Sequence, residues 1–295
     1  MNSREEGFLL LTSQLGDPER KPLSVAQLRQ LAASVRSASI GDPNREMGED
    51  DLVALGYQRP MARRILHLLA DRELLEYYLH MGKKAGCQPI TRASESYPLR
   101  VRKQLGDDSP GCLWAKGDLS LLERPCISLV GSRDLGKDNR EFARMAGREA
   151  ARQGYVLVSG NARGADKTAQ EACLGAGGQV ICVVADRLCD HSQKENVLYL
   201  SEDGFDSAFS AFRALSRNRI IHSLSPVTLV AQATYGSGGT WHGTERNLRF
   251  GWSGVCCFDD ESRATEELKQ MGAAGIRCEQ LADLPWLCEP SDRLF

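Results

Sequence analysis

The sequence predicts an α/β fold with a doubly wound, mostly parallel sheet and a small N-terminal helical module. From Cys126 onward, short runs rich in Val, Ile and Leu alternate with longer amphipathic stretches. Parallel strands need a crossover connection, usually a helix, so this alternation indicates a sheet covered on both faces. In addition, 295 residues that are 42% hydrophobic and 26% charged suffice for one full-sized domain and a smaller companion. We therefore expect a helical module over residues 1–86 and an α/β domain over residues 87–295.

Hydrophobic spacing predicts the helical module. Ser24 is a suitable N-cap for a helix whose apolar residues recur at three- and four-residue steps, namely Val25, Leu28, Leu31 and Val35. Pro60 opens a second apolar run that extends to Tyr78 and fits two short helices. Between the two runs, residues 37–50 are rich in Gly, Pro, Asn and charge, which predicts a loop. The module could serve packing or dimerisation, or it could contact a ligand of the larger domain.

The α/β domain is predicted from strands and helices in alternation. The expected strands are residues 126–130, 155–158, 179–184, 227–230 and 255–258. The expected helices are residues 139–153, 166–174, 240–250 and 263–271. In open parallel sheets, ligands bind where the carboxyl ends of strands lead into helix N-termini. The loops after these strands are therefore the places to search for a site.

Charge and cysteine content narrow the function classes. A formal net charge of -2 gives no global attraction to a polyanion, so nucleic-acid binding would need a local basic patch. The ten cysteines are scattered singly except for Cys256-Cys257, in no spacing suited to zinc, so we expect reduced thiols and neither a metal nor a cofactor. No signal peptide or run of about 18 apolar residues is present, so we expect a cytoplasmic protein without membrane contact.

The first loop of interest is Gly131-Ser132-Arg133, which follows the first expected strand. The glycine permits a sharp turn, the Ser132 hydroxyl can bond a phosphate oxygen, and Arg133 supplies a positive charge. A plain strand-to-helix turn would explain the same residues.

The second loop runs from Ser159 to Asp166, between an expected strand and an expected helix. Gly160 and Gly164 allow backbone amides to approach an anion, and Arg163 can add a charge-assisted hydrogen bond. Asp166 could cap the helix or orient Arg163. The spacing matches neither a Walker loop nor the dinucleotide fingerprint.

The third and fourth segments follow later in the chain. Arg217 and Arg219 flank Asn218 at the head of an apolar run, so the arginines can engage adjacent phosphates while Asn218 bonds a base or sugar. A solvated basic turn would explain the same residues. Ser237-Gly238 precedes an expected helix and adds a further group of backbone amides, with Trp241 nearby either to stack on a base or to pack in the core. We expect the arginine-bearing loops to converge at one edge of the sheet and to bind a phosphate-bearing ligand.

Taken in order, these segments resemble the DprA/Smf family of DNA-processing proteins. The series comprises Tyr97-Pro-Leu99, Leu113-Trp-Ala-Lys-Gly117, Val130-Gly-Ser-Arg133, Ser159 to Asp166, Ser201-Glu202, Phe212, Arg217-Asn-Arg-Ile-Ile221, Leu224-Ser225 and Ser237-Gly238. It covers about residues 97–258, and the ordered series is far more specific than any single member.

The resemblance implies an extended Rossmann-like fold and a non-enzymatic role in DNA uptake and recombination. It further implies binding of single-stranded DNA, self-association as a homodimer, and transfer of the strand to a RecA-type recombinase. By position, it assigns DNA contact to Gly131, Ser132, Arg133, Arg163, Arg217, Asn218 and Arg219, with Gly160 and Gly164 shaping the pocket.

The chain also departs from the family pattern. The family's histidine after the second glycine loop is Gln170 here, the acidic residue that ends a later strand is Gln232, and the Pro-Gly after the last strand is Asp259-Asp260. We expect no C-terminal winged-helix domain.

An alternative is a small-nucleotide sensor or an N-glycoside phosphoribohydrolase, such as one in a defence system. Gly238-Gly-Thr240 and Glu245 are similar to the glycine-rich loop and nearby glutamate of those branches of the fold. A hydrolase needs a carboxylate beside the ribose, and Glu245 is the candidate.

Overall fold

One mixed sheet organises the protein, which a computed structural model describes over residues 1–38 and 47–288. Within those residues, nine strands lie in the order β1-β2-β6-β5-β4-β3-β7-β8-β9. The strands are β1 Gln88–Thr91, β2 Cys112–Lys116, β3 Cys126–Val130, β4 Val156–Ser159, β5 Gln179–Val183, β6 Val197–Ser201, β7 Val227–Val230, β8 Gly254–Phe258 and β9 Ala274–Ile276. The pairs β1–β2 and β2–β6 are antiparallel and the other six are parallel.

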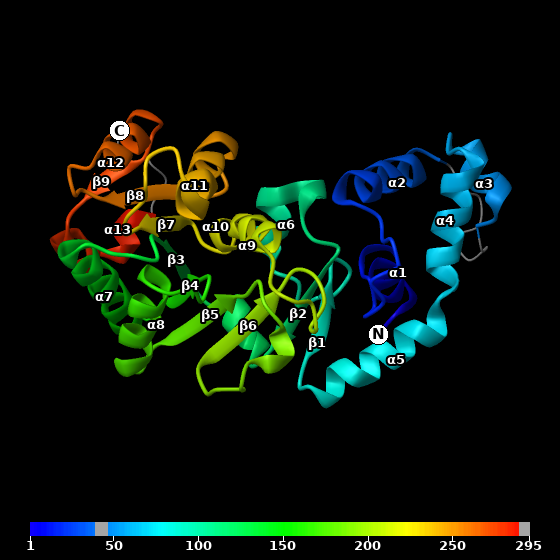
Figure 1. The fold of residues 1–295 in the computed structure, drawn as a ribbon, viewed down its shortest axis with the longest axis horizontal. Coiled ribbons are helices and arrows are strands. Elements are labelled where there is room, and N and C mark those ends of the chain that lie inside the picture. The colour runs from blue at the N-terminus through cyan, green and yellow to red at the C-terminus, as the bar shows by residue number, and fades with distance from the viewer. Residues whose placement is uncertain (39–46, 289–295) are drawn as a thin grey trace.

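Helices lie on both sides of this sheet (Figure 1). Those of the N-terminal part are α1 Ser3–Thr12, α2 Val25–Ser37, α3 Glu49–Ala54, α4 Arg59–Ala70 and α5 Arg72–Lys84. Those that follow are α6 Leu99–Leu105, α7 Lys137–Arg152, α8 Ala165–Gly175, α9 Ala211–Ser216, α10 Asn218–Ser223, α11 Gly238–Phe250, α12 Arg263–Gln270 and α13 Leu284–Cys288. The predicted loop over residues 37–50 overlaps the last residue of α2 and the first two of α3, and its residues 39–46 lie outside the described residues.

The doubly wound, mostly parallel sheet is confirmed. From β3 the chain moves outward through β4 and β5, then returns to place β7 on the other side of β3. The strand order therefore reverses between β3 and β7, which is the position where doubly wound folds bind ligands. Each of the five expected strands is present within one residue or so of its predicted bounds.

Two hydrophobic cores cover the two faces of the sheet. On one face, α7 and α8 pack side chains such as Phe142, Ala146 and Cys173 against the strands. On the other face, α6, α10, α11 and α12 contribute residues such as Val101 and Ile220. Because strands such as β3 and β4 are buried along their whole length, their sequences are continuous apolar runs without alternation.

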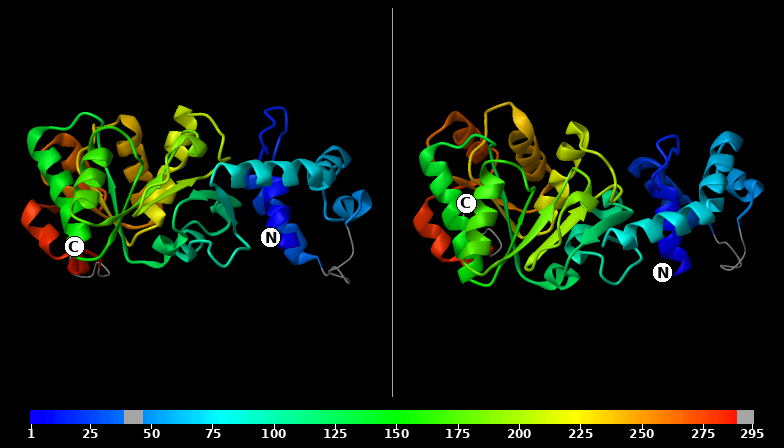
Figure 2. Two further views of the ribbon diagram at one scale, coloured as in Figure 1. Left: turned by 90° about the horizontal axis from the view of Figure 1, so that it is seen from below. Right: turned by 60° about the horizontal axis from the view of Figure 1, so that its bottom comes forward.

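The helical module lies at the β1 end of the sheet (Figures 1 and 2). Helices α2 to α4 have a core of their own that includes Leu31, Leu52 and Ile65. Helices α1 and α5, in contrast, share the core of the sheet, where the Tyr78 ring meets the Trp114 ring edge-on at 5.3 Å between centroids. The predicted boundary at residue 86 falls between α5 and β1, but the packing is continuous across it.

Residues near the N-terminus form α1, which is not among the helices predicted from the sequence. Asn2 caps this helix by accepting from the Arg4 and Glu5 amides, while Leu9 and Leu10 are buried. Within the described part of the chain, every helix is too short or too polar to cross a membrane.

Candidate functional site

A cavity of about 430 Å³ opens at the carboxyl ends of β3 and β7, at the reversal point of the sheet. Many of the predicted site residues line it, namely Gly131, Ser132, Arg133, Asp166, Arg217, Asn218, Ser237 and Gly238. These residues come from segments about a hundred positions apart in the sequence, and the sheet topology gathers them. The size is typical of small-ligand pockets, which span about 300 to 1,000 Å³.

The loop after β3 is held in place by backbone hydrogen bonds, and its Arg133 side chain is exposed. The Ser132 amide donates to the Gln232 carbonyl at 2.9 Å, and the Ser132 carbonyl accepts from the Ala165 amide at 3.1 Å. Arg133 is exposed at the cavity. It forms no ion pair with another described residue, so its guanidinium is available to a ligand.

Asp166 holds the loop after β4, which corrects both roles expected for it. One of its carboxylate oxygens accepts from the Gly160 amide at 3.0 Å and the Ala162 amide at 3.1 Å. Burial raises the pKa of Asp166, and the nearby Arg217 charge opposes that rise. Arg163 is not oriented by Asp166, because it pairs with Asp134 at 3.1 Å on the exposed surface.

Gly164 and Ser159 of this loop support the cavity from outside its lining, whereas Ala162 lies in the lining. Gly164 is the N-cap of α8 at φ +88, and a Cβ there would lie 2.4 Å from the Ser132 carbonyl oxygen. Only glycine therefore allows the two loops to approach this closely. Ser159 is buried beneath them, and its hydroxyl accepts from the Gln170 side chain at 2.5 Å.

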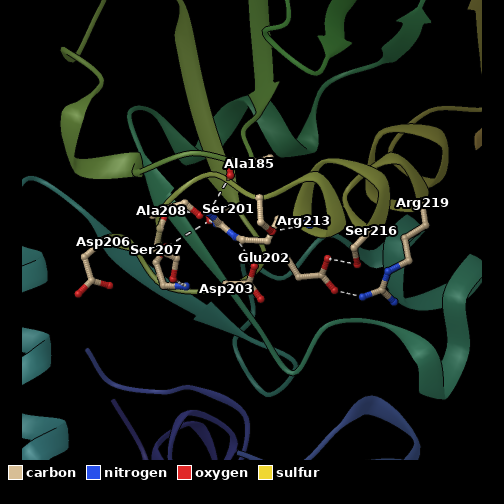
Figure 3. Close-up of polar contacts among 12 residues, drawn as sticks. Ala185, Ser201, Glu202, Asp203, Asp206, Ser207, Ala208, Arg213, Ser216 and Arg219 are labelled. Atoms are coloured by element: carbon tan, nitrogen blue, oxygen red, sulfur yellow. Dashed lines mark hydrogen bonds and ion pairs between the residues drawn. The ribbon is translucent and has the colours of Figure 1, made fainter. Parts of the chain in front are cut away.

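Arg217 and Arg219 do not project side by side, contrary to the expectation that they engage adjacent phosphates. Arg217 is 9% exposed, and its guanidinium donates to the carbonyls of Gly160 and Val183. Arg219 forms an ion pair with Glu202 (Figure 3). Residues 218–223 form α10, and side chains two positions apart on a helix do not face each other. Burial lowers the pKa of both arginines.

The Asn218 side chain connects α10 to the start of α11 through its amide nitrogen, which therefore already has a hydrogen-bond partner. That nitrogen donates to the Gly239 carbonyl at 2.9 Å. The first residues of α11, Gly238 to Thr240, line the cavity. The first amides of a helix lack intrahelical partners and, together with the helix dipole, favour an anion.

The apolar wall of the cavity is not among the features predicted from the sequence. Phe209 and Leu215 line the cavity and are 58% and 47% exposed. They precede the Arg217 segment in a stretch with no predicted strand or helix, and apolar residues in such a stretch were the available signal. Exposed aromatic faces accept any base by stacking.

The other candidate residues lie outside the cavity lining. Trp241 is 4% exposed and packs in the core, edge-on to Tyr235. Glu245 projects from α11 toward His242, at 3.6 Å. Asp166 is thus the one carboxylate of the described residues that lines the cavity. No cluster suited to a metal ion occurs in the described part of the chain, and all ten cysteines are free thiols.

Comparisons with known proteins agree on one family. The family model described as DNA recombination-mediator protein A matches residues 88–282. The chain is 32% identical over 168 residues to DNA processing protein DprA of Bacillus subtilis, covering 53% of this chain and 56% of that protein. It is 31% identical over 160 residues to protein Smf of Escherichia coli, covering 50% of this chain and 42% of that protein. The chain thus spans about half the length of these curated relatives.

Solved structures of similar fold include two proteins from the same group. The structure of DprA from Streptococcus pneumoniae superposes with a TM-score of 0.71 at 25% identity, covering 97% of this chain and 98% of that one. A structure of DNA processing protein A from Helicobacter pylori, described for its single-stranded DNA binding mode, has a TM-score of 0.57 at 24% identity. It covers 68% of this chain and 96% of that one.

Proposed function

The chain belongs to the DNA recombination-mediator protein A family, and on that premise we propose that it binds single-stranded DNA in the cavity at the carboxyl ends of β3 and β7. The binding is non-enzymatic: the cavity holds a strand for DNA processing and does not cut it. Arg133 and the first backbone amides of α11 bind phosphates of the strand. The bases of the strand pack against the apolar wall of the cavity.

The observation that carries this proposal is the meeting of three kinds of group in one cavity. Arg133 supplies an exposed positive charge, the α11 N-terminus supplies unpaired amides, and Phe209 supplies an exposed aromatic face. Phosphate contacts and base stacking together are how proteins hold single strands without reading their sequence. The net charge of -2 makes this local grouping necessary, because the molecule as a whole does not attract a polyanion.

The known relatives support the same proposal. The solved Helicobacter pylori protein is described as binding single-stranded DNA. The family model that matches this chain is described as a DNA recombination-mediator protein. We extend this to a homodimer that passes its strand to a RecA-type recombinase. Sedimentation of the chain alone, and capture of such a recombinase on chain-bound oligonucleotide, would test these two steps.

A hydrolase is less well supported by the site. Glu245 lies outside the cavity lining, and the cavity-lining Asp166 uses a carboxylate oxygen to bind two backbone amides. A carboxylate held in this way is poorly placed to activate water beside a ribose. Simple sensing of a mononucleotide remains compatible with the cavity volume, and a mononucleotide competitor should be included in the binding test.

The test is a fluorescence polarisation titration with a labelled oligothymidine at several salt concentrations. We expect affinity to fall steeply with salt, because bound phosphates release counterions. Arg133→Ala should weaken binding and reduce the slope of log affinity against log salt by about 1, as loss of one phosphate contact does.

Arg148→Ala is the matched control, because Arg148 is exposed on α7 at a distance from this cavity. It should leave both affinity and slope unchanged. Absence of binding at low salt would refute the proposal, and so would equal effects of the two substitutions. Displacement of the oligonucleotide by a mononucleotide at similar concentration would favour the sensor.

A further inference from the structure

The apolar wall of the cavity belongs to a stretch with little regular structure of its own. We define the wall segment as residues 203–216, from the end of β6 through the six-residue helix α9. Its residues 203–210 form bends and irregular structure, and its later part carries Phe209 and Leu215 into the cavity. Contacts other than the hydrogen bonds of regular strands and helices must therefore fix the conformation of the wall segment.

The Arg213 side chain supplies most of that support (Figure 3). It pairs with Asp203 at the start of the wall segment, and it donates to the carbonyls of Ser207 at 2.6 Å and Ala208 at 2.8 Å. Its own amide donates to the Ser210 hydroxyl at 3.1 Å, which caps α9. Arg213 thus fastens the first half of the segment onto the second half.

Arg213 also anchors the wall segment to the sheet. It donates to the Ala185 carbonyl at 2.7 Å, just beyond β5, and to the Ser201 hydroxyl at 2.9 Å, at the end of β6. The Arg213 side chain is only 10% exposed. A guanidinium carries five donors in a fixed fork, and these contacts occupy every nitrogen of it. The Arg213 guanidinium therefore stabilises the fold and does not bind a ligand.

The helical module holds the same segment at a second point. The Tyr78 hydroxyl on α5 donates to the Asp206 carboxylate at 2.5 Å, and Tyr78 packs on Phe205 with 4.6 Å between ring centroids. Burial raises the pKa of Tyr78, so this hydroxyl keeps its proton and remains a donor at neutral pH. The wall segment is thus held by Arg213 from inside and by Tyr78 from the module.

We infer that Arg213 is a positioning residue for single-strand binding: it holds the wall segment in the conformation that presents Phe209 and Leu215 to the bases. This inference rests on the proposed function. A wall that is already ordered before binding spares the ligand the cost of ordering those side chains. Arg213 acts through Phe209 and Leu215, without touching the strand itself.

The test compares Arg213→Lys with wild type in two measurements. Hydrogen exchange followed by mass spectrometry should show faster exchange over residues 203–210. Oligothymidine affinity should fall by about tenfold, because two side chains must then be ordered on binding. The salt slope should stay at the wild-type value, since no phosphate contact is lost.

Two further variants separate positioning from general damage to the fold. Arg187→Lys is the control, because Arg187 makes a single contact to the wall segment, at the Asp206 carbonyl, from the exposed surface. It should change neither measurement by more than twofold. Tyr78→Phe keeps the ring and removes one hydrogen bond, and it should shift both measurements in the direction of Arg213→Lys by a smaller amount.

The outcomes are distinguishable from failure of the proposed function. If the wild-type protein does not bind oligothymidine, the proposed function fails. If hydrogen exchange over residues 203–210 is unchanged in Arg213→Lys, the inference about Arg213 fails, whatever the binding result. If wild type binds, an unchanged affinity in Arg213→Lys overturns it, and so does a reduced salt slope, which would mean that Arg213 contacts phosphate directly.

Discussion

Burial decides which charged side chains of the cavity can meet a ligand. Arg217 and Asp166 are both buried, and their polar atoms are directed largely to backbone groups of the loops that they support. Removing such a side chain would leave buried backbone groups without hydrogen-bond partners, and each such group destabilises the fold. The Arg133 side chain has no such structural role among the described residues. A substitution at Arg133 therefore reports on binding, whereas one at Arg217 reports first on folding.

His222 gives a pH-dependent prediction at this scale. Burial lowers the pKa of His222 to about 3, whereas an unfolded chain has a histidine pKa of about 6.5. Between these values the unfolded chain holds a proton that the folded one lacks, so the free energy of unfolding falls as pH falls below 6.5. By pH 5 the loss is about 2 kcal/mol.

Urea unfolding at pH 7 and pH 5 measures this loss. His222→Gln should reduce the difference between the two pH values by about 2 kcal/mol. His67→Gln, at an exposed position on α4, should leave the difference as in wild type. A full-sized difference in His222→Gln would contradict the assignment.

At the scale of elements, the sequence was most informative where strands are fully buried. The runs at β3, β5 and β7 stand out because both of their faces are covered. Strands β1, β2, β6 and β9 were missed. Strands β1 and β2 form the antiparallel extension of the sheet, and β6 runs parallel to β5 after a connection without an α-helix, so no strand-helix-strand alternation marks these three. The loops of the cavity were identified by their glycines and arginines, but the directions of Arg217 and Arg219 depend on where α10 begins, which residue types alone do not give.

The contact between the loop after β4 and the junction of α9 and α10 gives a prediction at this scale. Gly160 follows β4, and a Cβ there would lie 2.5 Å from a guanidinium nitrogen of Arg217. Gly160→Ala must therefore displace Arg217 or the β4 loop, at a cost of about 1–3 kcal/mol in unfolding free energy. Oligothymidine affinity should fall too, because Arg217 lines the cavity.

Gly175→Ala is the matched control, since Gly175 ends α8 with no atom within 4 Å of a Cβ and no positive φ. It should be neutral or stabilising by up to about 1 kcal/mol. Chemical denaturation of the two variants checks the difference. Equal stability of Gly160→Ala and wild type would mean that Arg217 is not held against the β4 loop.

At the scale of the whole molecule, the helical module is joined to the sheet domain by a shared core. Trp114 on β2 is fully buried, and Tyr78 from α5 and Phe205 from the wall segment both pack on it. The exposed ion pairs between α2 and the turn at Asp107 and Asp108 add little, because solvent screens them. The module thus contributes apolar contacts that the sheet cannot replace, and one of them, between Tyr78 and Phe205, is with the wall segment.

Removing residues 1–86 should therefore destabilise the remaining chain. The deletion takes away Leu9, Leu10, Leu15, Leu75 and Tyr78 from the core that surrounds Trp114. Burial of one such side chain is worth about 1.5–3 kcal/mol, so their combined loss approaches the total stability of a typical domain, about 5–15 kcal/mol. We expect a red shift of the total tryptophan emission as Trp114 becomes exposed, binding of a hydrophobic dye, and loss of oligothymidine affinity as the wall segment loosens. Leu52→Ala, which opens a cavity only in the separate core of α2 to α4, should preserve the emission and the affinity. A truncated chain with wild-type emission and thermal stability would show instead that the module is an independent domain.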